Sequence, residues 1–206
     1  MKLILIRHGE TCWNKERLVQ GGDSDIALNE TGLAQAASLA RFLENECVVS
    51  VYSSPMQRAK ATAEAIASRH GLAVEVDEAL REINVGELEG MSVLHLNTTF
   101  SRFLMERWRN RVGTGSSDGE TIDEVQRRTW GVVERLLDRH SVDHGPDAGG
   151  AVVIVSHFFV TLAIMLKALD LPVNCFPRFR VDLAGVTVLE LGDHDIRLLT
   201  FNDTSY

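Results

Sequence analysis

Short apolar runs alternate with longer stretches of helical periodicity along this chain, which leaves few folds open to it. Residues 3–6, 48–52 and 151–156 are nearly continuous apolar runs, the pattern of strands buried on both faces of a sheet. In residues 31–46, apolar residues recur at spacings of three and four, which is typical of an amphipathic helix. Strands that alternate with helices predict an α/β fold, with a mainly parallel central sheet flanked by helices on both faces.

Local signals predict the remaining elements. Pro55 is suited to the first turn of a helix, here expected over residues 55–69. Thr121-x-x-Glu124 is a capping-box pattern, which predicts a helix over residues 121–140. The other expected elements are a helix over 160–169 and strands over 73–76, 186–191 and 196–201, the last two joined by a turn at Gly192-Asp193.

Length and composition restrict the class of protein. The 206 residues suit a single domain spanning residues 1–206. No apolar run reaches the roughly 18 residues that cross a bilayer, and the N-terminal run is too short for a signal peptide. The net charge of -8 argues against nucleic-acid binding, and three cysteines without a CxxC pair indicate reduced thiols. We therefore expect a cytoplasmic protein with neither a membrane nor a nucleic acid as partner.

Histidine and arginine side chains follow the three apolar runs. Arg7 and His8 follow the first run, Arg58 comes shortly after the second, and His157 follows the third. Ligands of an open parallel sheet bind beyond the carboxyl ends of its strands, so these side chains should meet at one edge. Arginine binds phosphate oxygens, and histidine can act as a nucleophile near neutral pH. The set suits phosphoryl transfer, for which Glu82 is one candidate proton donor.

Several ordered sequence blocks resemble the signature of the histidine phosphatase superfamily, which includes the cofactor-dependent phosphoglycerate mutases. The first block is LIRHGET at residues 5–11, followed closely by Trp13-Asn14. Because the blocks extend over about residues 3–157, the resemblance implies a phosphoglycerate mutase-like fold. The later blocks, in family order, are LNETG at 28–32, SSPMQRA at 53–59, ExxxGxxEG at 82–90, DGET at 118–121 and VSH at 155–157.

The resemblance also implies a role for each matching residue. His8 would be the nucleophile that becomes phosphohistidine, and Glu82 would protonate the leaving oxygen and then activate water. The resemblance further implies that no metal or other cofactor is needed and that the partner is a small phosphorylated metabolite. The residues implied to hold the phosphoryl group or the rest of the substrate are Arg7, Asn14, Gln20, Gly21, Arg58 and His157.

Two departures from the family pattern bear on the activity. Phe158 stands where the family usually has glycine after the second histidine, which puts an aromatic ring at or beside the pocket and makes Phe158 a candidate substrate-binding residue. Residues 91–118 would form a short cap-like insertion, with one or two helices over 91–111, where the mutases carry a longer basic insertion. The short insertion favours hydrolysis and a closer likeness to broad-specificity or alpha-ribazole phosphatases than to true mutases.

The sequence therefore predicts a phosphomonoesterase, beside three alternatives. One is a cofactor-dependent phosphoglycerate mutase-type phosphotransferase, distinguished by its dependence on a bisphosphate primer. Another is a non-catalytic protein that binds a phosphorylated ligand. The third is a protein phosphatase that acts on phosphopeptides, which would need an open mouth to the site. An exposed closing strand could also pair across a homodimer, which makes a second copy of the chain a candidate partner.

Overall fold

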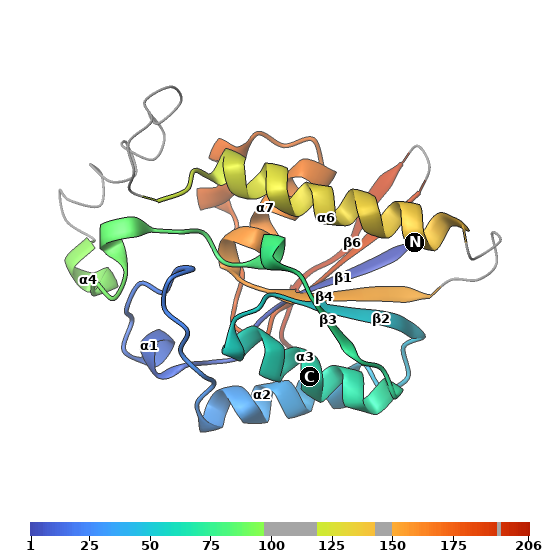
Figure 1. Ribbon diagram of the computed structural model, residues 1–206, viewed down its shortest axis with the longest axis horizontal. Helices are drawn as coiled ribbons and strands as arrows, with labels where there is room; N and C mark the ends of the chain where they lie inside the picture. Colours follow the sequence, from blue (N-terminus) through green and yellow to red (C-terminus); the bar gives the residue numbers. More distant parts are fainter. Residues whose placement is uncertain (97–118, 143–149, 193–194) are drawn as a thin grey trace.

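A six-stranded sheet in the order β3-β2-β4-β1-β5-β6 forms the centre of the computed structural model (Figure 1). The structure describes residues 1–96, 119–142, 150–192 and 195–206. Strands β1 to β4 run parallel to one another, whereas β5 is antiparallel to both β1 and β6. The predicted α/β fold with a mainly parallel sheet is confirmed. The strands are β1 (Lys2–Arg7), β2 (Val48–Ser53), β3 (Val74–Val76), β4 (Ala151–Ser156), β5 (Val186–Leu191) and β6 (Ile196–Asp203).

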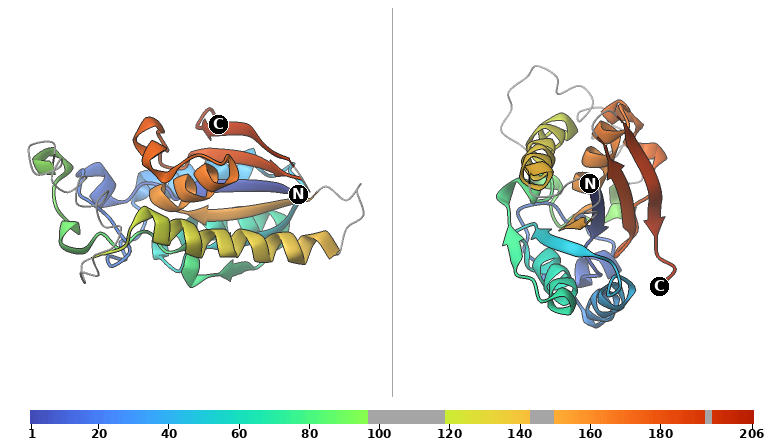
Figure 2. Two further views of the ribbon diagram at one scale, coloured as in Figure 1. Left: turned by 90° about the horizontal axis from the view of Figure 1, so that it is seen from above. Right: turned by 90° about the vertical axis from the view of Figure 1, so that its right-hand side faces the viewer.

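Pairs of helices cover both faces of the sheet, as the views of Figure 1 and Figure 2 agree. Helix α2 packs beside α3, and α6 packs beside α7. Both faces need cover because every residue of the central strand β4 is buried. The bounds are α2 (Glu30–Phe42) and α3 (Gln57–His70) on one face, and α6 (Ile122–Val142) and α7 (Phe158–Ala168) on the other.

The apolar core consists of two clusters, one on each face of the sheet, and side chains of β1 contribute alternately to the two. Leu3 and Leu5 pack into the cluster that contains residues of α6 and α7. Ile4 and Ile6 pack into the cluster that contains residues of α2 and α3. Successive side chains of a strand point to opposite faces, so this one short strand contributes to both cores.

The capping box predicted at the start of α6 is confirmed. Thr121 Oγ1 accepts a hydrogen bond from the Glu124 amide at 3.2 Å, and the Glu124 carboxylate accepts one from the Thr121 amide at 2.7 Å. Helix α2 begins in a similar way, because the side chain of Asn29 accepts a hydrogen bond from the Gly32 amide at 2.9 Å. Each bond satisfies a backbone donor that the first turn of a helix leaves free.

The predicted start of α3 is wrong. Pro55 lies outside the helix, whose N-cap is Met56 in an extended conformation. The reason is that the chain stays paired with the sheet beyond the end of β2: the Ser54 amide donates to the Val155 carbonyl at 3.1 Å. Pro55 therefore serves the turn between strand and helix, where its fixed φ and missing N–H are also tolerated.

Two further helix ends differ from the predictions. Helix α7 begins at Phe158 instead of residue 160, because His157 is its N-cap in an extended conformation. Helix α2 ends at Phe42 instead of residue 46, where Leu43 is the C-cap. The shift in α7 has a consequence for the site, because it places Phe158 in the first turn of a helix.

Short helices join the main elements. Apart from α4 (Val93–Leu96), which lies where one or two helices were predicted over residues 91–111, the periodicity did not predict them. Of the predicted cap-like insertion, the structure describes α4, and residues 97–118 lie outside the described residues. Within the part of the chain that is described, no helix is long and apolar enough to cross a membrane. The short elements are α1 (Cys12–Lys15), α4 (Val93–Leu96) and 3-10 helices at Glu78–Leu80, Gly86–Leu88 and Val173–Arg178.

Candidate active site

His8 and His157 lie together because they follow two neighbouring parallel strands. Strands β1 and β4 pair in a register that sets Arg7 opposite Ser156, so each histidine is the next residue beyond the sheet. The His8 amide donates to the Ser156 carbonyl at 2.9 Å. The two rings meet edge to face with centroids 5.1 Å apart, and both side chains are buried.

The ring of His8 is held in one tautomer. Its Nδ1 lies 2.7 Å from the Gly9 carbonyl oxygen, which can only accept a hydrogen bond. Nδ1 therefore carries the hydrogen, and Nε2 keeps a free lone pair. Burial, and after it the charges of Arg58 and Arg7, lower the pKa of His8 well below 6.5. His8 is thus a neutral imidazole at neutral pH, the form in which it can act as a nucleophile.

The backbone of Gly9 packs directly against the first turn of α2, which fixes the His8 loop. A Cβ atom on Gly9 would lie 2.6 Å from the Gly32 carbonyl oxygen. The Gly9 amide also donates to Thr62 Oγ1 of α3 at 3.2 Å. Only glycine permits this approach of two backbones.

Arg58 is buried and anchored on main-chain carbonyls. Its Nη1 donates to the Ser24 carbonyl at 2.8 Å and its Nη2 to the Gly21 carbonyl at 2.9 Å. In the same manner, Arg7 Nη1 donates to the Val181 carbonyl at 2.6 Å. Burial lowers the pKa of both guanidinium groups to about 10, so both remain cations at neutral pH.

Three nitrogen atoms of this cluster are buried without a hydrogen-bond partner among the described residues: Arg7 Nε, Arg58 Nε and His157 Nδ1. A buried donor that stays unpaired costs about 1–3 kcal/mol, and such groups call for an explanation. His157 Nε2 already contacts Ser54 Oγ at 2.7 Å, which leaves Nδ1 as its free position. An oxyanion, with several acceptor atoms, would satisfy all three nitrogens at once.

Glu82 adds a buried carboxyl group to the cluster. Its Oε1 accepts a hydrogen bond from the Ile83 amide at 2.8 Å, and its Oε2 accepts one from the Phe159 amide in the first turn of α7 at 3.4 Å. Burial raises the pKa of Glu82 above 4.5, although these amides and Arg58 oppose the shift. A carboxyl group with a raised pKa can deliver a proton near neutral pH.

Arg128 of α6, which the sequence did not indicate as a site residue, forms hydrogen bonds with the segment that carries Glu82. Its Nη1 donates to the Ala79 carbonyl at 2.6 Å, and its Nη2 lies 3.3 Å from the Glu82 carbonyl. Its Nε pairs with Glu120 at 2.8 Å, and the second oxygen of Glu120 accepts from the Asn84 amide at 3.1 Å. The DGET block pointed to Glu120, but no local pattern indicated its arginine partner.

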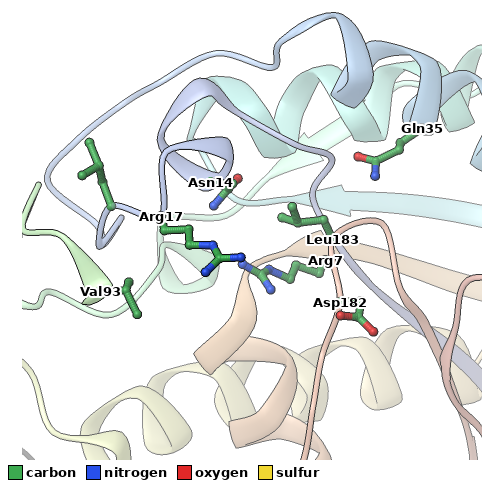
Figure 3. A pocket seen from close by; sticks show the side chains of 8 residues that line it. Arg7, Asn14, Arg17, Gln35, Val93, Asp182 and Leu183 are labelled. Atoms are coloured by element: carbon green, nitrogen blue, oxygen red, sulfur yellow. The ribbon is translucent and has the colours of Figure 1, made fainter. Parts of the chain in front are cut away.

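The polar residues implied to contact substrate lie around this cluster. Gln20 Oε1 accepts from Thr11 Oγ1 at 2.9 Å, and its Nε2 is buried without a partner among the described residues. The Gly21 carbonyl is an anchor for Arg58, and its amide donates to Glu89 at 3.0 Å. Asn14 lines a cavity of about 480 Å³ that also reaches Arg7 (Figure 3). Their contacts with a substrate remain a prediction.

Phe158 lies beside the cationic cluster, in the position expected for an aromatic ring near the pocket. The guanidinium carbon of Arg7 is 5.4 Å from the centroid of the Phe158 ring, a cation–π contact. The ring meets Phe159 edge to face with centroids 5.0 Å apart. The aromatic pair therefore supports one side of Arg7, and its effect on the choice of substrate remains a hypothesis.

A model of the histidine phosphatase superfamily (branch 1) matches residues 3–204. The chain belongs to the histidine phosphatase superfamily. This histidine phosphatase is 31% identical over 186 residues to a protein of Yersinia pestis described as a probable phosphoglycerate mutase, GpmB. That match covers 88% of this chain and 80% of the relative.

Solved structures similar to this histidine phosphatase include several phosphatases. Mycobacterial hydrolase 1 superposes with a TM-score of 0.87 at 29% identity, covering 99% of each chain. The phosphoserine phosphatase of Entamoeba histolytica, solved in complex with 3-phosphoglyceric acid, superposes with a TM-score of 0.83 at 28% identity, covering 99% of this chain and 98% of that one. A mycobacterial glucosyl-3-phosphoglycerate phosphatase superposes with a TM-score of 0.84 at 27% identity, covering 98% and 99%.

Potential metal ligands do not cluster in the part of this histidine phosphatase that the structure describes: no group of three or more His, Cys, Asp or Glu side chains there is arranged to hold a metal ion. The ionisable groups beside the two histidines are the two arginines and the carboxyl of Glu82.

Proposed function

We propose that the chain is a phosphomonoesterase that takes the phosphoryl group of a small phosphorylated metabolite onto Nε2 of His8. The observation that carries the proposal is the set of buried nitrogens without partners on Arg7, Arg58 and His157, in one cluster with a neutral His8. A phosphoryl group supplies the acceptors that these donors lack. The two arginine charges would stabilise the transferring group, which is the main requirement of phosphoryl transfer.

In the first step, the lone pair of His8 Nε2 attacks phosphorus while the bond from phosphorus to the ester oxygen breaks. Glu82 in its protonated form, which the raised pKa favours, gives its proton to that oxygen, and the alcohol leaves. The Gly9 carbonyl accepts the hydrogen of Nδ1 at 2.7 Å and so stabilises the positive charge of the phosphorylated ring.

In the second step, a water molecule attacks the phosphorus of phosphohistidine. The Glu82 carboxylate takes a proton from this water while the bond between phosphorus and Nε2 breaks. Inorganic phosphate leaves, His8 is neutral again and Glu82 is protonated again, so the cycle closes. Neither step requires a metal or another cofactor, and we propose that the whole chain, residues 1–206, acts as one domain in the cytoplasm.

A second candidate is a phosphoglycerate mutase-type phosphotransferase. The relative described as a probable phosphoglycerate mutase favours it, because the identity of 31% extends over 88% of this chain. The same residues would serve both reactions, but a mutase returns the phosphoryl group to its substrate instead of to water. A mutase therefore depends on a bisphosphate primer, which a phosphatase does not need.

Hydrolysis of a panel of phosphomonoesters in the presence of EDTA, by the wild type and by His8→Ala, tests the proposal. Turnover that survives EDTA and disappears in the variant supports a metal-free histidine mechanism. Rapid acid-free quenching with a labelled ester should also leave label on the wild type but not on His8→Ala. Phosphoglycerate interconversion that needs a bisphosphate primer, with no release of phosphate, would favour the mutase instead.

A further inference from the structure

The cavity of about 480 Å³ beside the phosphoryl site is lined by two arginines from different segments. In Figure 3, Arg7 extends from the end of β1 and Arg17 from the segment after α1, and the two guanidinium groups reach into the cavity from opposite sides. Arg7 also belongs to the cluster around His8. The cavity is therefore the space into which the rest of a bound phosphomonoester can extend.

The amide side chains that line the cavity offer donors. The Oδ1 atom of Asn14 already accepts from the Thr11 amide at 3.1 Å and from the Thr11 hydroxyl at 3.0 Å. The Oε1 atom of Gln35 accepts from the Glu10 amide at 2.8 Å. Both side chains thus keep an NH₂ group for which no described residue supplies an acceptor.

The single carboxylate in the lining, Asp182, interacts electrostatically with Arg7 and also forms hydrogen bonds with residues outside the lining. Asp182 accepts from Asn202 Nδ2 at 2.9 Å and from Arg180 Nε at 2.7 Å. None of the described carboxylates forms an ion pair with Arg17. The cavity therefore presents an excess of positive charge and of N–H donors, which is the setting that binds an anion.

The backbone of Arg17 is strained, which a purely structural role does not explain. Its φ angle is 57°, in the left-handed region. The Arg17 amide donates to the Asn14 carbonyl at 3.1 Å, and the Leu18 amide to the Trp13 carbonyl at 2.9 Å. These bonds form the Schellman arrangement that ends a helix, in which the residue at this position is most often glycine. An arginine in this left-handed conformation makes the fold less stable than a glycine would. Residues with such strained backbone angles concentrate at functional sites.

We propose that this cavity is an outer subsite for a second anionic group on the alcohol portion of the substrate, and that Arg17 determines specificity by binding it. The inference rests on the proposed phosphatase function and names its substrate class: phosphomonoesters that carry a carboxylate or a similar oxyanion a few bonds from the ester oxygen. Leu18, Val93 and Leu183 supply apolar walls for the carbon skeleton between the two anionic groups.

Two esters that differ in one group test this assignment: 3-phosphoglycerate, with a carboxylate, and glycerol 3-phosphate, with a hydroxymethyl group in its place. We expect the wild type to prefer 3-phosphoglycerate in kcat/KM. Arg17→Gly should reduce this preference by about tenfold or more, because a charge-assisted hydrogen bond is lost. Arg17→Lys should keep part of it, since it retains the charge but loses the planar fork.

Two controls separate recognition from folding. Arg17→Gly relieves the strained φ angle, so its melting temperature should equal or exceed that of the wild type. Lys15→Gln removes an exposed positive charge from the end of α1, two residues before Arg17, without changing the lining of the cavity, and should leave the preference unchanged.

An unchanged preference in Arg17→Gly, or an equal loss for both esters, would overturn the subsite. If the wild type hydrolyses neither ester, the proposed phosphatase function is contradicted for these substrates. The subsite is then tested separately, by calorimetric measurement of the binding of both esters. Binding of 3-phosphoglycerate must then be tighter than binding of glycerol 3-phosphate in the wild type, and the difference must shrink in Arg17→Gly. Equal affinities would refute the subsite in that case.

Discussion

The His8 and His157 rings stand edge to face, 5.1 Å between centroids, at the ends of two strands whose sequence positions are far apart. Neither ring can take up a proton readily, because each is buried and lies near the charges of Arg58 and Arg7. At neutral pH these four side chains are therefore two neutral imidazoles and two cations. A bound phosphoryl dianion would place negative charge beside these groups. That charge would raise the pKa of His157 and allow it to act as a cation during the reaction.

Glu82→Gln should separate the acid role of this carboxyl group from mere binding. We expect kcat for alkyl phosphates to fall by about 10²–10⁴, since the leaving oxygen loses its proton donor. Glu82 loses its proton as the pH rises through its raised pKa, so the wild-type rate should decline over that range. This decline in the pH–rate profile should be absent in the variant.

The choice of leaving group provides the control for Glu82→Gln. An aryl ester such as 4-nitrophenyl phosphate leaves readily without a proton, so the first step should suffer much less in the variant. Glu87→Gln, an exposed carboxylate of the same segment, should behave as the wild type. Equal losses of kcat/KM, which reports the first step for each ester, would argue against general acid catalysis by Glu82.

Acid should weaken the fold through the buried histidines. The pKa of His157 is well below 6.5 in the folded protein, whereas the unfolded chain has the ordinary value. Below roughly pH 6.5 the unfolded state binds more protons, so the free energy of unfolding falls as the pH falls. His157→Asn should therefore lose less stability than the wild type between roughly pH 7 and pH 5.

Urea unfolding at each pH measures that difference directly. Glu82 contributes with the opposite sign, because its raised pKa lets the folded state hold a proton above 4.5. It is present in both proteins, so comparing the wild type with His157→Asn isolates the histidine. Parallel curves of unfolding free energy against pH would contradict a neutral, buried His157.

Arg58→Lys should weaken binding of inorganic phosphate. A lysine has one ammonium nitrogen in place of three guanidinium nitrogens, so it cannot reproduce the planar arrangement in which Nη1 and Nη2 hold the Ser24 and Gly21 carbonyls and Nε remains for the ligand. We expect the rise in melting temperature with phosphate to need about tenfold or more phosphate in the variant. Arg69→Lys, a half-exposed position near the other end of α3, should respond as the wild type does. Equal responses of all three proteins would remove Arg58 from the phosphate site.

Gly9→Ala should destabilise the protein although it adds only a methyl group. The new Cβ would lie 2.6 Å from the Gly32 carbonyl, so the His8 loop or α2 must move, at a cost of about 1–3 kcal/mol. Gly131→Ala is the matched control: it sits inside α6 with its nearest neighbour at 3.8 Å, and it should stabilise by up to about 1 kcal/mol. Thermal unfolding measures both, and opposite signs are expected.

The sequence was sufficient to predict that His8, Arg58 and His157 meet, because ends of parallel strands lie at one edge of a sheet. It was not sufficient for groups whose place depends on how distant segments dock. Arg128 contacts the Glu82 carbonyl across 46 positions of the chain, and that contact depends on the docking of α6. The start of α3 was missed for a related reason, because pairing with β4 continues past the end of β2 and delays the helix beyond Pro55.

The anchors of Arg7 and Arg58 are peptide carbonyls of Val181, Gly21 and Ser24, and neither guanidinium forms an ion pair with a carboxylate of the described residues. A peptide oxygen is present whatever side chain its residue carries. Replacement of the Val181 or the Ser24 side chain therefore leaves these hydrogen-bond acceptors in place. A mutation at such a position can remove the acceptor only by changing the conformation of the main chain. The positive charge of the pocket therefore depends on the conformation of the backbone. It should persist when the side chains of the residues that supply these carbonyls are substituted.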